Sequence, residues 1–321
     1  MNTMTITNNN ILTNNEGTAM TTNTISTIST NATTISSSAV LFDLSIKVFS
    51  ATVTDAEVAD GVAADNNASH KAGTYLKNLL AECKELDTIK KFAAMVRTWN
   101  KNLTMPWNDN GLRLLPMSLM LDHKAQLTEF ERQYWDMVDA FLADYNTHVG
   151  AAAFTLGKMF DRSNYPTEHE VRGKFAFNKM YSPVPTAGHW MVDTNNAGLA
   201  EVVEHSMHEA HSREARAMQN VWDRMYKIVS HMADKLKESN FDGSRPDGKK
   251  TKLHDSMLSN AEDFVGLLDD LNVGKDPRLS EMGNDLRRLL AVTDLGDLKK
   301  DAGARVAAKA KLDDILNKFN L

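Results

Sequence analysis

One of two long helical patterns in this chain reads DHKAQLTEFERQYWDMVDAFLADYNTHVGAAAFTLGKMF, residues 122–160. Its apolar side chains recur at alternating steps of three and four, as in Leu127, Phe130 and Tyr134. Residues 197–238 show the same spacing, and neither segment contains a proline. Narrow apolar stripes of this period are typical of coiled coils, and a helix cannot bury such a stripe alone. The sequence therefore predicts that the two segments pack against each other as a long antiparallel hairpin, or that they pack against the helix ending at Trp99.

A strand pattern and a run of short helices complete the predicted fold. Residues 40–48, VLFDLSIKV, alternate apolar and polar side chains with the two-residue period of a half-buried strand. Because a lone strand leaves its edge groups unpaired, residues 188–193 are its predicted partner. A short helix is expected at residues 167–180, with Thr167 and Glu170 as its capping box. Amphipathic helices are expected at about residues 252–271, 277–292 and 297–319. The predicted fold class is mainly α, with a long coiled-coil-like antiparallel hairpin, a small two-stranded β element and a C-terminal helical bundle.

Composition divides the chain into three parts. Residues 1–38 are rich in Asn, Thr and Ser and almost uncharged, so they offer too little apolar surface to offset the entropy of ordering and are predicted to be a disordered tail. Residues 39–239 form the predicted helical domain with the hairpin and the small sheet. A loop with the sequence FDGSRPDGKK follows at residues 241–250, and residues 250–321 form the predicted C-terminal helical region.

Charge and cysteine content exclude several classes of protein. The chain has 321 residues, a net charge of -6 and one cysteine, Cys83. A single cysteine cannot form an internal disulfide, which favours a reducing, intracellular setting. The net acidity argues against coating of nucleic acid through bulk charge. The most apolar run, residues 149–156, is far too short to span a membrane.

Histidines at residues 205–211 are the weak candidates for a metal site. His205 and His208 are three residues apart, and Glu201 precedes His205 by one helical turn, so the three side chains share one helical face. The spacing lacks an HExxH motif and no second Glu-x-x-His helix completes the set. We therefore interpret this as a polar helical face and predict no metal and no cofactor. A metal-dependent hydrolase centred on His205 and His208 is therefore only the third of three functional hypotheses, after an interaction protein and a nucleic-acid-binding protein.

The loop around residues 243–252 contains the candidates for nucleic-acid binding. Its sequence GSRPDGKKT approaches a phosphate-binding loop, but Lys250 replaces the expected hydroxyl residue and the loop follows a helix instead of a strand. Acidic neighbours dilute the positive charge and no aromatic residues are interleaved for base stacking. Nucleic-acid binding through the C-terminal basic residues is the second alternative for function, and its candidate residues are Arg245, Lys249, Lys250 and Lys252.

The connector LTMPWNDNGLRLLP, residues 103–116, is the candidate interaction site. It combines apolar residues with turn signals at Pro106 and at Asn110-Gly111. These residues either plug the end of the core, which the turn beside Trp107 favours, or form an exposed patch for a partner. In the second interpretation the interaction residues are Met105, Trp107, Leu112, Arg113 and Leu114.

Several short sequence motifs, in a fixed order along the chain, resemble those of a known family. They are LFDLSIKVF at residues 41–49, MPWNDNGLRLLP at 105–116, FLADY at 141–145, NYP at 164–166 and PVP at 183–185. Over roughly residues 41–239 the sequence resembles an uncharacterised family, a domain of unknown function, of tailed bacteriophages and prophages. His189 departs from the pattern, which has a carboxylate at that position. The resemblance implies that the protein is a companion of MoxR-type or cobaltochelatase-like AAA+ ATPases, and it supplies no catalytic residues.

The leading expectation for function is a non-enzymatic helical interaction or adaptor protein of a phage or prophage. The resemblance implies that it works with an AAA+ ATPase in the cytoplasm of the infected host cell. Self-association through the long helices is a further expected contact. No membrane association is predicted.

Overall fold

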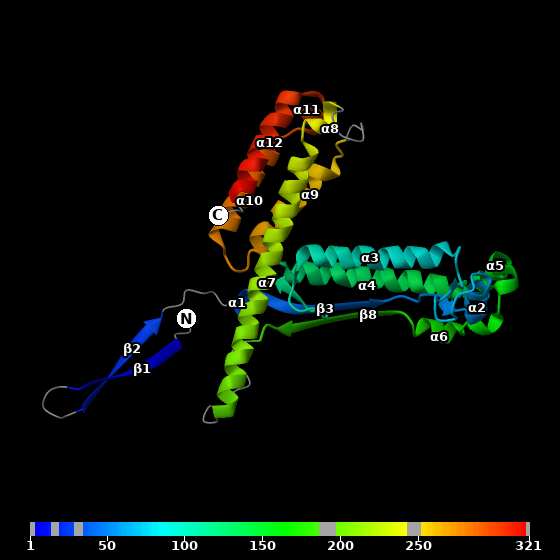
Figure 1. The fold of residues 1–321 in the computed structure, drawn as a ribbon, viewed down its shortest axis with the longest axis horizontal. Coiled ribbons are helices and arrows are strands. Elements are labelled where there is room, and N and C mark those ends of the chain that lie inside the picture. Colours follow the sequence, from blue (N-terminus) through cyan, green and yellow to red (C-terminus); the bar gives the residue numbers. More distant parts are fainter. Residues whose placement is uncertain (1–3, 14–18, 29–34, 186–196, 243–251, 319–321) are drawn as a thin grey trace.

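The computed structural model describes residues 4–13, 19–28, 35–185, 197–242 and 252–318. The described chain is mostly helical and has two hydrophobic cores. One core lies in an elongated arm, residues 39–184 (Figure 1). The other lies mainly in a body formed by residues 197–242 and 252–318, and it also includes side chains of the arm such as Leu41, Met105 and Leu114. None of the described helices is long and apolar enough to cross a membrane.

A four-stranded antiparallel sheet joins the arm to the body. The strand order is β6-β7-β3-β8. Leu41 on β3 lies opposite Leu114 on β7 and opposite Ser182 on β8. The strands are β3 (Ala39–Lys47), β6 (Met105–Pro106), β7 (Arg113–Pro116) and β8 (Ala176–Pro183).

The strand predicted at residues 40–48 is confirmed as β3, but the sheet is larger than the two strands predicted. The predicted partner, residues 188–193, lies outside the described residues. β8 instead pairs along β3 from Val40 to Lys47, in a stretch for which the sequence predicted a helix up to Met180. A short apolar run is ambiguous between helix and strand by periodicity alone, and here pairing with β3 determines the outcome.

Helices of the arm cover the face of the sheet that carries Phe42, Ile46 and Phe177. α4 packs along α3, and both contribute to the arm core. Thr167 and Glu170 form the predicted capping box at the start of α6. The helices are α3 (Lys84–Leu103), α4 (Met120–Ala143), α5 (Tyr145–Leu156) and α6 (Glu168–Arg172).

The predicted long hairpin is wrong. Residues 122–160 are divided at Asp144 into α4 and α5, and α4 packs on α3, which is the alternative that the sequence left open. α7 (Ala197–Lys235) crosses the end of the arm and buries its stripe against the C-terminal helices (Figure 1). The spacing of apolar residues along a helix predicts that this face is buried. It does not identify the element that covers the face, because any apolar surface of similar width can do so.

Helices are present in the three predicted C-terminal segments, but the third segment is divided into two helices at Asp301. Of these helices, α9 and α12 pack on α7. Ala217, Val221, Met225, Val229 and Met232 of α7 share one core with them, so the predicted division between residues 239 and 250 falls inside a shared core. The helices are α8 (Ser239–Asp242), α9 (Ser256–Leu271), α10 (Pro277–Ala291), α11 (Leu295–Lys300) and α12 (Ala302–Asn317).

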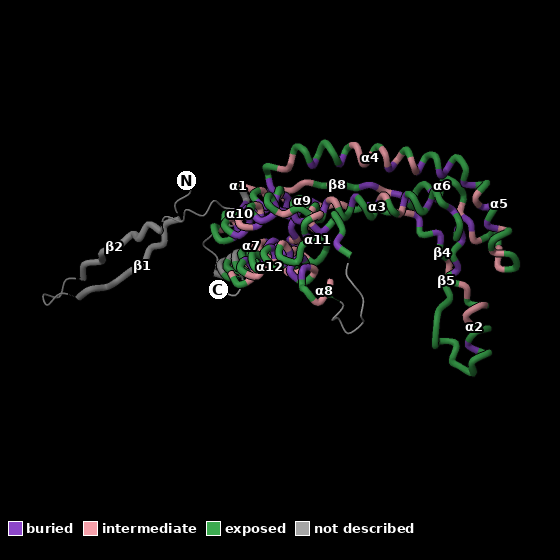
Figure 2. The backbone as a smooth tube through the Cα atoms, turned by 90° about the horizontal axis from the view of Figure 1, so that it is seen from above, coloured by how far each residue is buried: buried purple, intermediate pink, exposed green. Residues whose placement is uncertain are grey.

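The remaining elements lie at the two ends of the arm. Within the segment predicted to be a disordered tail, the described residues 4–13 and 19–28 pair as the antiparallel strands β1 and β2, and α1 leads into β3 (Figure 1). At the far end, α2 and the β4–β5 pair accompany α5, and exposed residues predominate there (Figure 2). The elements are β1 (Met4–Thr13), β2 (Ala19–Ile28), α1 (Ile35–Ser38), β4 (Thr52–Thr54), α2 (Ala56–Asp65) and β5 (Leu76–Asn78).

Candidate functional site

The predicted interaction residues lie in the β6–β7 hairpin, where the arm meets the body. Met105, Trp107 and Leu114 are buried in the body core, and Leu112 packs against it while partly buried. The turn is closed by Asn108, whose Oδ1 accepts hydrogen bonds from the backbone of residues 110 and 112. This burial agrees with the plug interpretation, because the apolar side chains are already occupied by the protein itself.

Arg113 is the polar member of this hairpin. Its Nε donates to Thr104 Oγ1 at 2.5 Å and its Nη2 to the Thr104 carbonyl at 2.9 Å. Burial, together with the nearby guanidinium of Arg224 on α7, lowers the pKa of Arg113 to about 10. Burial also lowers the pKa of Arg224, whose Nη2 donates to the Asn102 carbonyl at 2.7 Å. The joint between arm and body thus concentrates two positive charges.

These two arginines have no acidic partners among the described residues. Within the described part of the chain neither Arg113 nor Arg224 forms an ion pair with a carboxylate, and the buried Nη1 of Arg224 has no hydrogen-bond partner. The guanidinium of Arg224 lies over the ring of Phe264 on α9, 5.3 Å from its centroid. The seam between α7 and α9 is therefore positively charged where it reaches the arm.

The weak metal candidates are not brought together with further ligands. His205 and His208 are exposed on the N-terminal part of α7. Among the described residues, neither belongs to a group of three side chains that could hold a metal ion. The geometry thus offers no support for a hydrolase centred on these two histidines.

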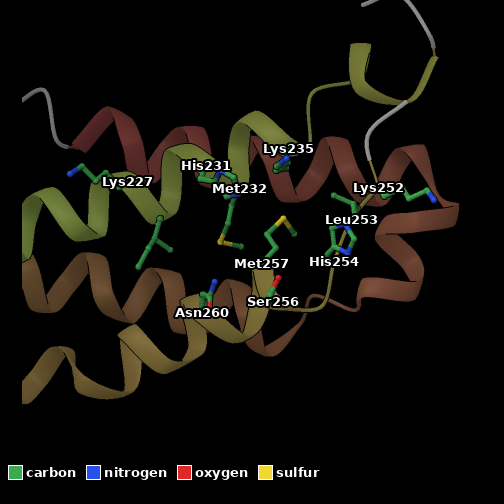
Figure 3. Close-up of a pocket in the computed structure, with 11 residues that line it drawn as sticks. Lys227, His231, Met232, Lys235, Lys252, Leu253, His254, Ser256, Met257 and Asn260 are labelled. Carbon is green, nitrogen blue, oxygen red and sulfur yellow. The ribbon is translucent and has the colours of Figure 1, made fainter. Parts of the chain in front are cut away.

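The weak nucleic-acid candidates fall mostly outside the described residues. Arg245, Lys249 and Lys250 are in that part of the chain. Lys252 is described, and it lies at the edge of a cavity of about 320 Å³ between α7 and the start of α9 (Figure 3). We call this cavity the basic groove and treat it as the candidate binding site.

An apolar floor and a cationic rim distinguish the basic groove. Met232 and Met257 point toward each other across it (Figure 3). The floor is completed by Ile228 and Leu253. The rim and polar wall consist of Lys227, His231, Lys235, Lys252, His254, Ser256 and Asn260.

The charge of the basic groove is uncompensated within the described residues. No carboxylate is among its lining residues, and none of Lys227, Lys235 and Lys252 forms an ion pair there. Asp255, next to the groove in sequence, lies 3.9 Å from Lys299. The positive end of the α9 dipole at Ser256 adds to the field. An anionic group is the natural ligand of such a rim.

The sequence of α7 contains a regular spacing of basic residues that points to this site, but the apolar stripe of the same helix is the more prominent pattern. Lys227, His231 and Lys235 follow one another at steps of four, which places three basic side chains on one face of α7. That spacing alone describes a solvated helix face. The groove needs α9 and the segment carrying Lys252 and His254 to complete it, and only the tertiary structure supplies them.

Comparisons with known proteins leave the fold and site to be interpreted on their own geometry. No family model, no curated protein and no solved structure matches the chain.

Proposed function

We propose that the protein is a non-enzymatic helical interaction protein that binds an acidic segment of a partner protein in the basic groove. The observation that carries the proposal is the uncompensated rim of Lys227, Lys235 and Lys252 around an apolar floor. Charge of one sign on a rim attracts a partner of the opposite sign, and an apolar floor contributes affinity by removing apolar surface from water.

A protein segment fits this groove better than a nucleic acid. The floor presents the flexible side chains Met232 and Met257, which adapt to an apolar side chain of a partner. No aromatic side chain is among the described lining residues, so the groove lacks the stacking platforms that single-stranded nucleic acids use. The positive charge of the rim could also attract a nucleic acid, so nucleic-acid binding through Lys252 and its neighbours is the alternative.

The identity of the partner rests on the family resemblance of residues 41–239. It implies a MoxR-type or cobaltochelatase-like AAA+ ATPase in the cytoplasm of an infected cell, and we include that ATPase in the proposal. A long arm joined to a body suits an adaptor, because the two parts present separated surfaces to different molecules (Figure 1).

A charge-reversal experiment tests the proposal. Lys227→Glu/Lys235→Glu reverses two groove charges, and the matched control Lys91→Glu/Lys124→Glu reverses two exposed charges on the arm helices. Tagged proteins are compared in pull-downs from infected cells with quantitative mass spectrometry. We expect the groove variant to lose the ATPase roughly tenfold, equivalent to about 1.4 kcal/mol, while the control captures it like the original protein.

Two outcomes would reject this function. Equal capture by the groove variant and the control would remove the groove from binding. Capture that disappears after nuclease treatment, together with salt-dependent retention of the original protein on DNA, would favour the nucleic-acid alternative.

A further inference from the structure

We infer that Cys83, Glu85 and His148 form a binding site for a zinc-like divalent transition-metal ion at the far end of the arm. The ligand atoms of the three side chains lie within 4.8 Å of one another. Cys83 Sγ is 3.6 Å from Glu85 Oε2, and His148 Nε2 is 3.9 Å from the same oxygen. This site is remote from the basic groove and does not depend on the proposed function.

The three side chains come from two elements that the arm core holds in place. Cys83 is the N-cap residue of α3, and Glu85 lies in the first turn of that helix. His148 lies in the first turn of α5, where its ring stacks on Phe141 with 5.6 Å between centroids and an angle of 12° between planes. Because Cys83 and Phe141 are buried in the arm core, the two elements approach each other in a defined way.

A buried nitrogen that has no hydrogen-bond partner among the described residues is the second observation that points to a ligand. His148 Nε2 is buried and makes no hydrogen bond, and its 3.9 Å separation from Glu85 is too long for one. A buried polar atom left unpaired carries an energetic cost. A metal ion bound between this nitrogen and the Glu85 oxygen would satisfy it.

The donor set identifies the class of metal. Thiolate, imidazole and carboxylate together are ligands for zinc and related transition metals, whereas calcium and magnesium prefer oxygen alone. Bond lengths of about 2.0–2.3 Å place neighbouring ligands of a tetrahedral ion about 3.3–3.6 Å apart. The Glu85 separations of 3.6 and 3.9 Å must close by up to about 0.6 Å, which the 55% exposed Glu85 side chain can do by moving. Cys83 Sγ and His148 Nε2 lie within 4.8 Å of each other, so binding also requires these two atoms to approach by up to about 1.3 Å.

Metal binding must overcome the protonation of the thiol. Burial raises the pKa of Cys83, so without a metal the group is a neutral thiol in an apolar setting. The bound ion would take the place of the thiol proton, as it does whenever a cysteine becomes a metal ligand. Three protein ligands leave a fourth position for water, on the side where Glu85 is exposed.

Cobalt titration of the full chain tests this site directly. Cys83 is the only cysteine in the sequence, so a thiolate-to-cobalt charge-transfer absorption band reports this residue and no other. We expect Co²⁺ to produce that band with one ion per chain, and Zn²⁺ to displace it. His148→Ala should weaken cobalt binding at least roughly tenfold.

Matched variants separate a built site from incidental binding. His205→Ala/His208→Ala removes the two exposed histidines of α7 and should leave the cobalt band unchanged. Zinc should raise the melting temperature of the original protein and not of His148→Ala, with circular dichroism confirming that both are folded. Absence of the band, or a band that His148→Ala and Glu85→Gln leave intact, would show that Cys83 is only an apolar filler of the core.

Discussion

Leu114 and Leu115 are neighbours on β7, yet they are buried in different cores. Leu114 packs with the body, opposite Leu41 on β3, whereas Leu115 packs with the arm, opposite Val40. Successive side chains of a strand point to opposite faces, so the sheet forms a wall shared by the two cores. The arm is therefore attached to the body through a packed sheet, and the basic groove has a defined position relative to it.

Trp107 should be structural. It is 3% exposed in the body core, so Trp107→Ala is expected to cost about 3–5 kcal/mol of unfolding free energy. Phe154→Ala, which removes an aromatic side chain that is 92% exposed, should change it by less than about 0.5 kcal/mol. Urea unfolding measures both. Equal free energies of unfolding for the two variants would contradict the structural role of Trp107 and favour its interpretation as a contact for a partner.

Two glycines should respond in opposite directions to alanine. A Cβ at Gly283 on α10 would lie 2.4 Å from Cδ2 of the buried Leu268, so Gly283→Ala should destabilise the body by about 1–3 kcal/mol. Gly266 on α9 has open space, and Gly266→Ala should stabilise by up to about 1 kcal/mol through helix propensity. Thermal unfolding compares them, and a stabilising Gly283→Ala would mean that α9 and α10 are less closely packed.

His123 should make the arm sensitive to acid. Its Nε2 donates to Asn100 Oδ1 at 3.0 Å and its Nδ1 accepts from the Tyr181 hydroxyl at 3.2 Å, which suits a neutral ring. Burial lowers the pKa of His123 to about 4 from the usual 6.5. As pH falls from 6.5 to 4, the unfolded chain gains a proton that the folded chain does not, so stability falls by about 3 kcal/mol from this group.

The comparison protein for this effect is His123→Gln. Its amide can donate to Asn100 and accept from Tyr181 but does not titrate. Urea unfolding at pH 7, 5.5 and 4.5 should therefore show a shallower loss of stability for His123→Gln than for the original protein. Parallel losses would mean that other groups account for the acid sensitivity.

Local patterns predicted individual elements well and their partners poorly. The alternation of residues 40–48 corresponds to β3, and the Thr167–Glu170 capping box is present, because both depend on neighbours in sequence. The predicted packing partner of α7 was wrong, since an apolar stripe of one period can pack against several different apolar faces. The groove was missed for the same reason: Lys235 and Lys252 meet only through the packing of α7 on α9.

Site-specific photo-crosslinking tests the central claim most directly. A photoreactive amino acid replaces the uncharged, exposed Asn260 at the groove in one protein and Lys124 on the arm in the other, and both are irradiated in infected cells. The proposed function predicts that position 260 alone crosslinks to a partner protein, the expected ATPase, and that the attached peptide is acidic with an apolar residue among its carboxylates. Crosslinks to nucleic acid, or the same protein crosslinked equally from both positions, would contradict it.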